Sequence, residues 1–262
     1  MAYILVALAS LVVSALTLFS GFGLGTLLMP VFALFFPVEL AIAATAIVHL
    51  ANNIFKVFLV GRKARLKVVA AFAIPATIAA VIGALCLGYF VDIAPIYSYE
   101  LFGRSLDLTA VKLTIGILIV IFGLLEIIPF FETIALDSKY IPLGGFLSGF
   151  FGGLSGHQGA LRTTFLMRLG MPKEEFVGTV VLSAVIVDVF RIAVYGFTFM
   201  RLELFSSGDS AIRGLVAAGI IFAFIGSFAG ARILKKVTMK FINKVVGVML
   251  IALGFGIAAG VL

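Results

Sequence analysis

The glycine-rich interruption between Gly156 and Thr163 contains three polar side chains that could bind a ligand, His157, Gln158 and Arg162. The planar guanidinium of an arginine holds a carboxylate, sulfite or sulfonate through two parallel hydrogen bonds. Glycine lets an oxyanion approach the backbone closely, and histidine exchanges protons near neutral pH. The segment therefore predicts an anion-binding site.

A second glycine-rich interruption, Gly21-Phe22-Gly23-Leu24-Gly25 followed by Thr26, lies about 134 residues earlier. The alignment of Gly25 with Gly159 extends well beyond the glycines. It also pairs Pro37 with Pro172, Thr45 with Thr179, Gly61 with Gly196, and Asn53-x-x-Lys56 with Asp188-x-x-Arg191. These matches indicate that the chain contains two copies of one unit.

The elements that carry these residues are membrane helices. The chain is 63% hydrophobic and 12% charged, whereas soluble globular proteins are roughly 25% charged. Apolar runs long enough to cross a hydrocarbon core of about 30 Å occur at 38–60, 68–90, 110–129, 172–195, 212–231 and 242–262. We therefore expect an all-α integral membrane protein with six full spans.

The net charge of +7 reflects topology rather than a nucleic-acid partner, because the basic residues gather in two short loops, 61–67 and 232–244. By the positive-inside rule both loops should be cytoplasmic in a multi-pass protein of the plasma membrane. No nucleic acid is expected as a partner, and the lipid bilayer is.

The two broken segments, 3–36 and 141–170, either cross the membrane once with a kink or fold back as re-entrant hairpins. Only hairpins place both basic loops on one side. Each half then has three spans and a hairpin, so the halves are inverted. We predict two inverted repeats, 1–130 and 141–262, joined by a loop at 131–140.

Backbone that leaves a helix inside a membrane needs protein or a water-filled cavity to satisfy its polar groups. Paired breaks in two halves are typical of a transporter's substrate site, where half-helix N-termini attract anions. The predicted substrate-binding residues are Gly23, Gly25, Thr26, His157, Gln158, Gly159, Arg162 and Thr163. No cofactor or metal site is predicted. A structural bond from Arg162 to a buried carbonyl or acid is the alternative.

Four further residues, His49, Asn52, Thr45 and Thr179, are candidates for proton coupling or polar lining. For His49 and His157, a neutral structural histidine is the competing interpretation. Lys56 and Arg191 lie about 19 residues past their helix-opening prolines, so we expect them to snorkel toward the far interface. Asp188 and Arg191, three residues apart, should form a structural pair.

These motifs resemble the sulfite exporter TauE/SafE family of membrane permeases. The resemblance rests on Gly21–Gly25 followed by Pro30, on Ala41-Ile42-Ala43-Ala44-Thr45, and on the second copy from Gly149 to Thr179. It implies export or uptake of small anions such as sulfite, sulfonates or other organic acids. Two departures, the polar Gly156–Arg162 segment and Thr164 in the place of Pro30, leave the identity of the anion open.

We therefore expect a secondary transporter, not an enzyme, that carries a small anion by alternating access. A proton or Na+ is a candidate coupling ion, and a homodimer is a candidate assembly. One alternative is a divalent-metal transporter that uses His49 and His157. Another is an intramembrane serine protease, because Gly153-Leu154-Ser155-Gly156 matches a nucleophile motif with Ser155 as the nucleophile.

Overall fold

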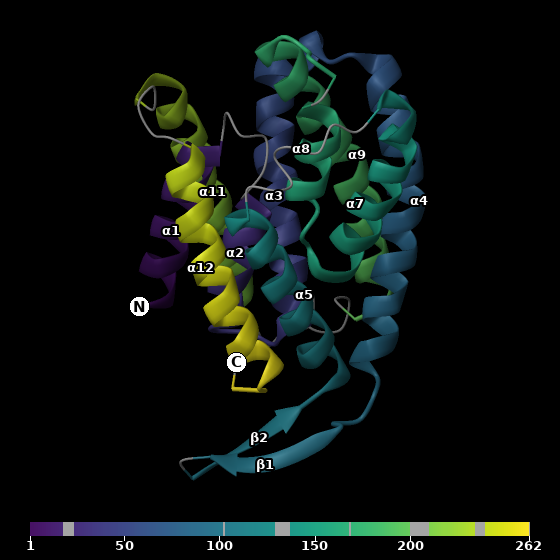
Figure 1. Ribbon diagram of the computed structural model, residues 1–262. Helices are drawn as coiled ribbons and strands as arrows, with labels where there is room; N and C mark the ends of the chain where they lie inside the picture. The colour runs from purple at the N-terminus through teal and green to yellow at the C-terminus, as the bar shows by residue number, and fades with distance from the viewer. Residues whose placement is uncertain are drawn as a thin grey trace.

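The computed structural model describes residues 1–17, 24–101, 103–128, 137–167, 169–199, 210–233 and 239–261. Within them the chain forms ten α-helices packed side by side, with a small β-hairpin at one end (Figure 1). The helices are α1 (Ala2–Thr17), α2 (Leu24–Ala33), α3 (Val38–Val60), α4 (Leu66–Val91), α5 (Ala110–Ile127), α7 (Ile141–Ser155), α8 (Gly159–Met167), α9 (Lys173–Phe197), α11 (Ser210–Ile233) and α12 (Met239–Ala258). The strands are β1 (Tyr97–Leu101) and β2 (Arg104–Leu108), and short 3-10 turns η1 (Gly61–Lys63) and η2 (Ser138–Tyr140) complete the elements.

The long apolar helices confirm a multi-pass membrane protein. Among the described residues, five helices are long and apolar enough to span a bilayer: α3, α4, α5, α9 and α11. The sixth expected span, 242–262, falls on α12, where the described apolar stretch, Val246–Ala258, is shorter than a full crossing. All six expected segments are thus helical, but only five of them, among the described residues, are long enough to count as a span.

Each broken segment forms two short helices. In the second segment α7 ends at Gly156, whose φ of 81° lies in the left-handed region that glycine adopts without strain. The chain then re-enters a helix at Gly159, and α8 packs back against α7 (Figure 1). In the first segment α1 likewise packs against α2, and the connection at 18–23 lies outside the described residues.

The helices of the two halves pack in reciprocal pairs. Helix α7 lies along α4 and α1 lies along α11, while α5 pairs with α12 and α3 with α9. Glycines permit the close approach in the first two pairs. A Cβ at Gly149 would collide with the carbonyl oxygen of Ala76, and one at Gly226 with that of Leu11. Backbones this close form the small-residue contacts that membrane helices use for association.

The loop after α3 lies against the start of α9. Arg65 donates its backbone N–H to Thr179 Oγ1 at 2.9 Å, and its guanidinium pairs with Glu175 at 2.7 Å. Lys63 forms a second surface ion pair with Glu174. Because the end of α3 meets the beginning of α9 and the two helices pack together, they run in opposite directions.

The connection between α4 and α5 contains an antiparallel hairpin in which Tyr97 pairs with Leu108 and Leu101 with Arg104. Tyr99 donates its hydroxyl to the carbonyl of Ala259, so the hairpin touches the end of α12. Lys112, at the start of α5, donates its Nζ to the carbonyl oxygen of Gly260 at 3.2 Å. These contacts gather the hairpin and the ends of α5 and α12 at one end of the molecule (Figure 1).

Candidate functional site

The start of α2 lies next to the second chain break inside the helix bundle. A Cβ built on Gly25, near the start of α2, would lie 3.5 Å from the carbonyl oxygen of Gly156 and 3.7 Å from Cδ2 of His49. A Cβ on Gly156 would in turn lie 3.9 Å from Nη1 of Arg191. Residues from α2, α3, α9 and the second break therefore meet at one point.

Asp188 on α9 is the centre of a buried hydrogen-bond network at this point. Its Oδ2 lies 2.6 Å from Nδ1 of His49 on α3, and its Oδ1 accepts from Gln158 Nε2 at 2.8 Å. Arg191 Nε donates to the same Oδ1 at 2.9 Å. Asn53 Nδ2 lies 3.1 Å from the ring nitrogens of His49. One carboxylate thus joins α3, α9 and the second break.

Arg191 also satisfies the backbone at the end of α7. Its Nη1 donates to the carbonyl of Gly152 at 2.7 Å, and Tyr195 donates its hydroxyl to the carbonyl of Gly153. The last carbonyls of a helix have no partner within the helix, and lipid supplies none. Arg191 and Tyr195 therefore stabilise the interrupted helix where it stops.

The expectation that Lys56 and Arg191 snorkel to the interface is wrong. Their side chains are buried, with 4% of Lys56 and 1% of Arg191 exposed. Counting residues from the helix start gives depth along the axis, but exposure depends on which helices surround that position. The predicted pairing of Asp188 with Arg191 is confirmed, with both groups fully buried.

Arg162, in the first turns of α8, is 1% exposed. Its Nε and Nη1 have no hydrogen-bond partner in the part of the chain that the structure describes. The hydroxyl of the adjacent Thr163 is also buried and without a described partner. Buried polar groups in native proteins are nearly always hydrogen-bonded, so a cluster of unpartnered donors marks a place for a ligand.

His157 lies in the break with its ring stacked on Phe122 of α5, with ring centroids 5.5 Å apart and planes 12° apart. Its Nδ1 lies 2.9 Å from the carbonyl oxygen of Ser155. A carbonyl accepts only, so Nδ1 carries the proton and donates. Nε2 is left buried and without a described partner.

Among the other predicted residues, Thr26 and Gly159 are buried beside the breaks, and Thr45 Oγ1 has no described partner. Gln158 donates its amide N–H to Asp188, and this hydrogen bond ties the second break to α9. Thr179 is bonded to the loop at Arg65 instead. Gly23 lies outside the described residues.

Asn52 links polar groups of two helices, α3 and α11. With its amide oriented to suit its neighbours, it donates to Ser227 Oγ at 2.8 Å and accepts from Lys56 Nζ at 3.3 Å. Sequence reasoning set aside Lys56, Asp188 and Arg191 as interfacial or structural and did not single out Phe122. The repeated spacing of a polar and a basic residue, Asn53-x-x-Lys56 and Asp188-x-x-Arg191, could have indicated Lys56, Asp188 and Arg191 from the sequence.

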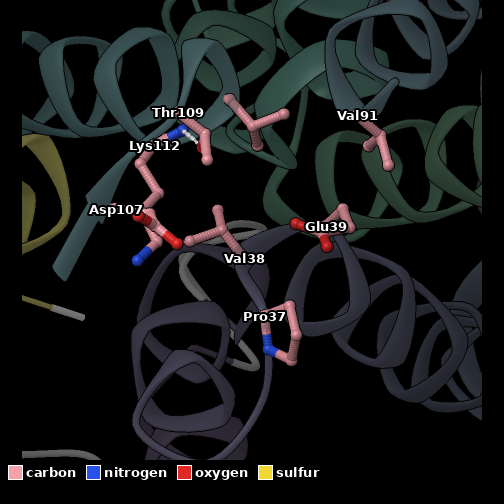
Figure 2. Close-up of a pocket in the computed structure, with 8 residues that line it drawn as sticks. Pro37, Val38, Glu39, Val91, Asp107, Thr109 and Lys112 are labelled. Atoms are coloured by element: carbon pink, nitrogen blue, oxygen red, sulfur yellow. Dashed lines mark hydrogen bonds between the residues drawn. The ribbon is translucent and has the colours of Figure 1, made fainter. Parts of the chain in front are cut away.

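A separate cavity of about 260 Å³ lies where the start of α3, the end of α4 and the start of α5 meet β2 (Figure 2). Its lining includes the carboxylates of Glu39 and Asp107 and the amine of Lys112. None of the predicted site residues in the described part of the chain lines it. It lies at the hairpin end of α3, and the buried polar network lies farther along that helix.

Comparison with known proteins identifies the family. The model of the family described as Sulfite exporter TauE/SafE matches residues 6–257. Neither the curated proteins nor the solved structures compared with this chain gave a match. Because the family match covers nearly the whole chain, the protein belongs to the sulfite exporter TauE/SafE family, whose members are membrane permeases and not enzymes.

Proposed function

We propose that this permease is a secondary transporter of a small oxyanion or organic anion of the sulfite, sulfonate or carboxylate type. The observation that carries the proposal is an excess of buried positive charge. Lys56, Arg162 and Arg191 are buried, whereas Asp188 is the one acidic residue that is fully buried among the described residues; Glu126 on α5 is partly exposed, with one carboxylate oxygen buried. An uncompensated charge in a membrane interior is costly, and a bound anion would neutralise it.

The anion binds between the starts of α2 and α8. Each of these helices follows a chain break and presents unpaired amides and the positive end of a helix dipole. On α8 the free guanidinium nitrogens of Arg162 and the hydroxyl of Thr163 add donors of the kind that oxyanions accept. Glycine at position 25 lets the start of α2 lie close to the second break, because a Cβ there would already contact Gly156 O and His49.

We further propose that the chain consists of two inverted repeats, 1–130 and 141–262. The reciprocal packing of α7 on α4 and α1 on α11 supports this arrangement, and so does the opposite direction of α3 and α9. Inverted repeats allow alternating access, in which one repeat rocks against the other around a fixed site.

In this topology the basic loop at 61–67 and the loop at 232–244 face the cytoplasm. The contact of Lys63 and Arg65 with the start of α9 supports re-entrant hairpins, because kinked single crossings would put that contact on opposite sides. Coupling to a proton or Na+, and assembly as a homodimer, stay predictions.

The alternative of a divalent-metal transporter is less well supported. His49 is bonded to Asp188 and His157 to a backbone carbonyl. Within the described residues there is no group of three or more metal-binding side chains. Three buried cations would also repel a divalent metal ion.

The alternative of a serine protease is wrong, because the family comprises permeases. The hydrogen bond of Ser155 also argues against a role as nucleophile. Ser155 donates its hydroxyl to the carbonyl of Phe151 at 2.9 Å, whereas a nucleophile needs a histidine base within reach.

The test is anion uptake into proteoliposomes, measured for sulfite, methanesulfonate and acetate. Arg162→Gln should reduce uptake of any transported anion by about tenfold or more, because it removes a charged donor from a buried site. Arg62→Gln, which removes an exposed guanidinium, is the matched control and should leave uptake unchanged. Equal uptake by the Arg162→Gln variant and the wild type would reject the site.

A further inference from the structure

Thr45 on α3 carries a buried hydroxyl without a hydrogen-bond partner. The residue is 2% exposed, and its Oγ1 has no partner among the residues that the structure describes. A threonine inside a helix can donate to the carbonyl four residues earlier, as Thr164 does to Ala160 at 3.0 Å. Thr45 makes no such bond. Because buried hydroxyls are nearly always hydrogen-bonded, this one is free to bind a ligand.

The neighbours of Thr45 on the same face of α3 show where the hydroxyl lies. Residues three and four apart in a helix share a face, so Thr45 lies between Ile42 and His49 on that face. Ile42 Cγ2 lies 3.8 Å from a Cβ built on Gly156. His49 is bonded at 2.6 Å to Asp188, the carboxylate that holds the second break. Thr45 therefore lies on the face of α3 that packs against the second break.

The starts of α2 and α8 lie beside the same part of the molecule. A Cβ built on Gly25 of α2 would lie 3.7 Å from Cδ2 of His49 and 3.5 Å from the carbonyl oxygen of Gly156. On α8, the backbone N–H of Arg162 donates to the carbonyl of Gln158 at 3.1 Å, which places Arg162 one helical turn after the break. Thr45 is thus next to the region where the starts of these two helices meet.

The equivalent threonine of the second half, Thr179, has a different role. It is buried as completely as Thr45, but its Oγ1 accepts the backbone N–H of Arg65 at 2.9 Å and lies 3.9 Å from the sulfur of Met171. Burial in an apolar helix therefore does not by itself leave a threonine hydroxyl unpartnered. Of this aligned pair, only Thr45 keeps its hydroxyl free among the described residues.

We propose that Thr45 is a substrate-binding residue whose hydroxyl donates a hydrogen bond to the transported anion. This inference rests on the proposed function and adds α3 to its site. Arg162 and Thr163 bind the anion from α8, and Thr45 binds it from α3. The anion is then held between a broken helix of the second half and a continuous helix of the first.

The test is calorimetric titration of the full-length protein in detergent with sulfite, methanesulfonate and acetate. Thr45→Val keeps the shape of the side chain and removes the hydroxyl. It should raise the Kd of any anion that binds the wild type by about tenfold or more, because a hydrogen bond to a charged group is worth this factor. Its unfolding temperature without anion should equal or exceed that of the wild type, since the empty protein loses no hydrogen bond.

Two further variants separate the hydroxyl from the shape and position of the side chain. Thr45→Ser keeps the hydroxyl and should bind with a Kd close to that of the wild type. Thr179→Val is the matched control. It removes the equivalent hydroxyl together with its bond to Arg65, so it should lower the unfolding temperature and leave the Kd unchanged.

The outcomes separate this inference from the proposed function. If Arg162→Gln weakens binding while Thr45→Val binds like the wild type, the inference is overturned and the anion site stands. A lowered unfolding temperature for Thr45→Val, or equally weak binding by Thr45→Ser and Thr45→Val, also overturns it, because the residue then acts through structure or shape. If none of the three anions binds the wild type, the proposed function fails and the inference fails with it.

Discussion

The carboxylate of Asp188 and the guanidinium of Arg191 form a fully buried ion pair, with Oδ1 2.9 Å from both Nε and Nη2. Because the same oxygen also accepts from Gln158, the pair connects a continuous helix, α9, to the break between α7 and α8. The permease therefore holds its interrupted helix in place with buried charge, in a region where lipid could not satisfy the exposed backbone.

Asp188→Asn should strongly destabilise the protein. The substitution keeps the size of the side chain but leaves Arg191 as an uncompensated buried charge, which costs about 3–5 kcal/mol. Thermal unfolding in detergent measures the effect. Asp92→Asn, at an exposed position, is the control and should unfold like the wild type. An unchanged unfolding temperature for Asp188→Asn would show that the pair contributes little.

Lys56→Gln should act in the opposite direction when no anion is present. It removes a buried charge that forms no salt bridge with an acid among the described residues, so the free energy of unfolding should rise by roughly 1 kcal/mol. The matched variant is Arg191→Gln, which breaks the ion pair with Asp188 and should lower the free energy of unfolding. Thermal unfolding in an anion-poor buffer measures the effect of both substitutions. A fall in stability for Lys56→Gln would mean that the charge is already compensated.

Gly25 should tolerate alanine but not leucine. A Cβ at this position makes ordinary contacts of 3.5 Å with Gly156 O and 3.7 Å with His49. The larger side chain of leucine would push against these groups and separate the start of α2 from the second break. We expect Gly25→Ala to keep most of its anion uptake and Gly25→Leu to lose about tenfold or more. Thermal unfolding of both variants separates a blocked site from a misfolded protein, and comparable uptake would place the substrate elsewhere.

Gly149→Ala should destabilise the protein although it adds a single methyl group. The added Cβ would collide with the carbonyl oxygen of Ala76, which is backbone and cannot rotate away. Overpacking of this kind costs about 1–3 kcal/mol. Gly25→Ala serves as the control, because its Cβ meets no such clash. Equal unfolding temperatures for the two variants would indicate that α7 and α4 can separate without cost.

The proposed topology predicts which loops face the same side of the membrane. In a Cys86→Ala background, single cysteines at Arg62 and Lys173 should react with a membrane-impermeant maleimide from the cytoplasmic side. A cysteine at Glu100 in β1 should react from the opposite side. All three positions are exposed. Labelling of positions 62 and 173 from different sides would contradict the inverted arrangement of the halves.

Much of the architecture could be predicted from the order of residues alone. Apolar length and the positions of glycine and proline determine where helices start, stop and break, because these are local properties of the chain. The expected spans 38–60 and 172–195 accordingly match α3 and α9 to within a few residues. The excess of positive charge near the second break was also visible at Arg162.

Only the tertiary structure decided which polar groups are satisfied and which are free. Gln158 was expected to bind substrate, but it contacts Asp188, while Lys56 was expected at the interface and is buried. The ring of His157 rests on Phe122, from a helix more than thirty residues away in sequence. Helical spacing gives depth along one axis, whereas burial and pairing depend on the neighbouring helices, which come from distant parts of the chain. Composition and the positions of glycine and proline therefore determined that this is a membrane protein with broken helices, whereas long-range packing determined which of its buried charges are paired.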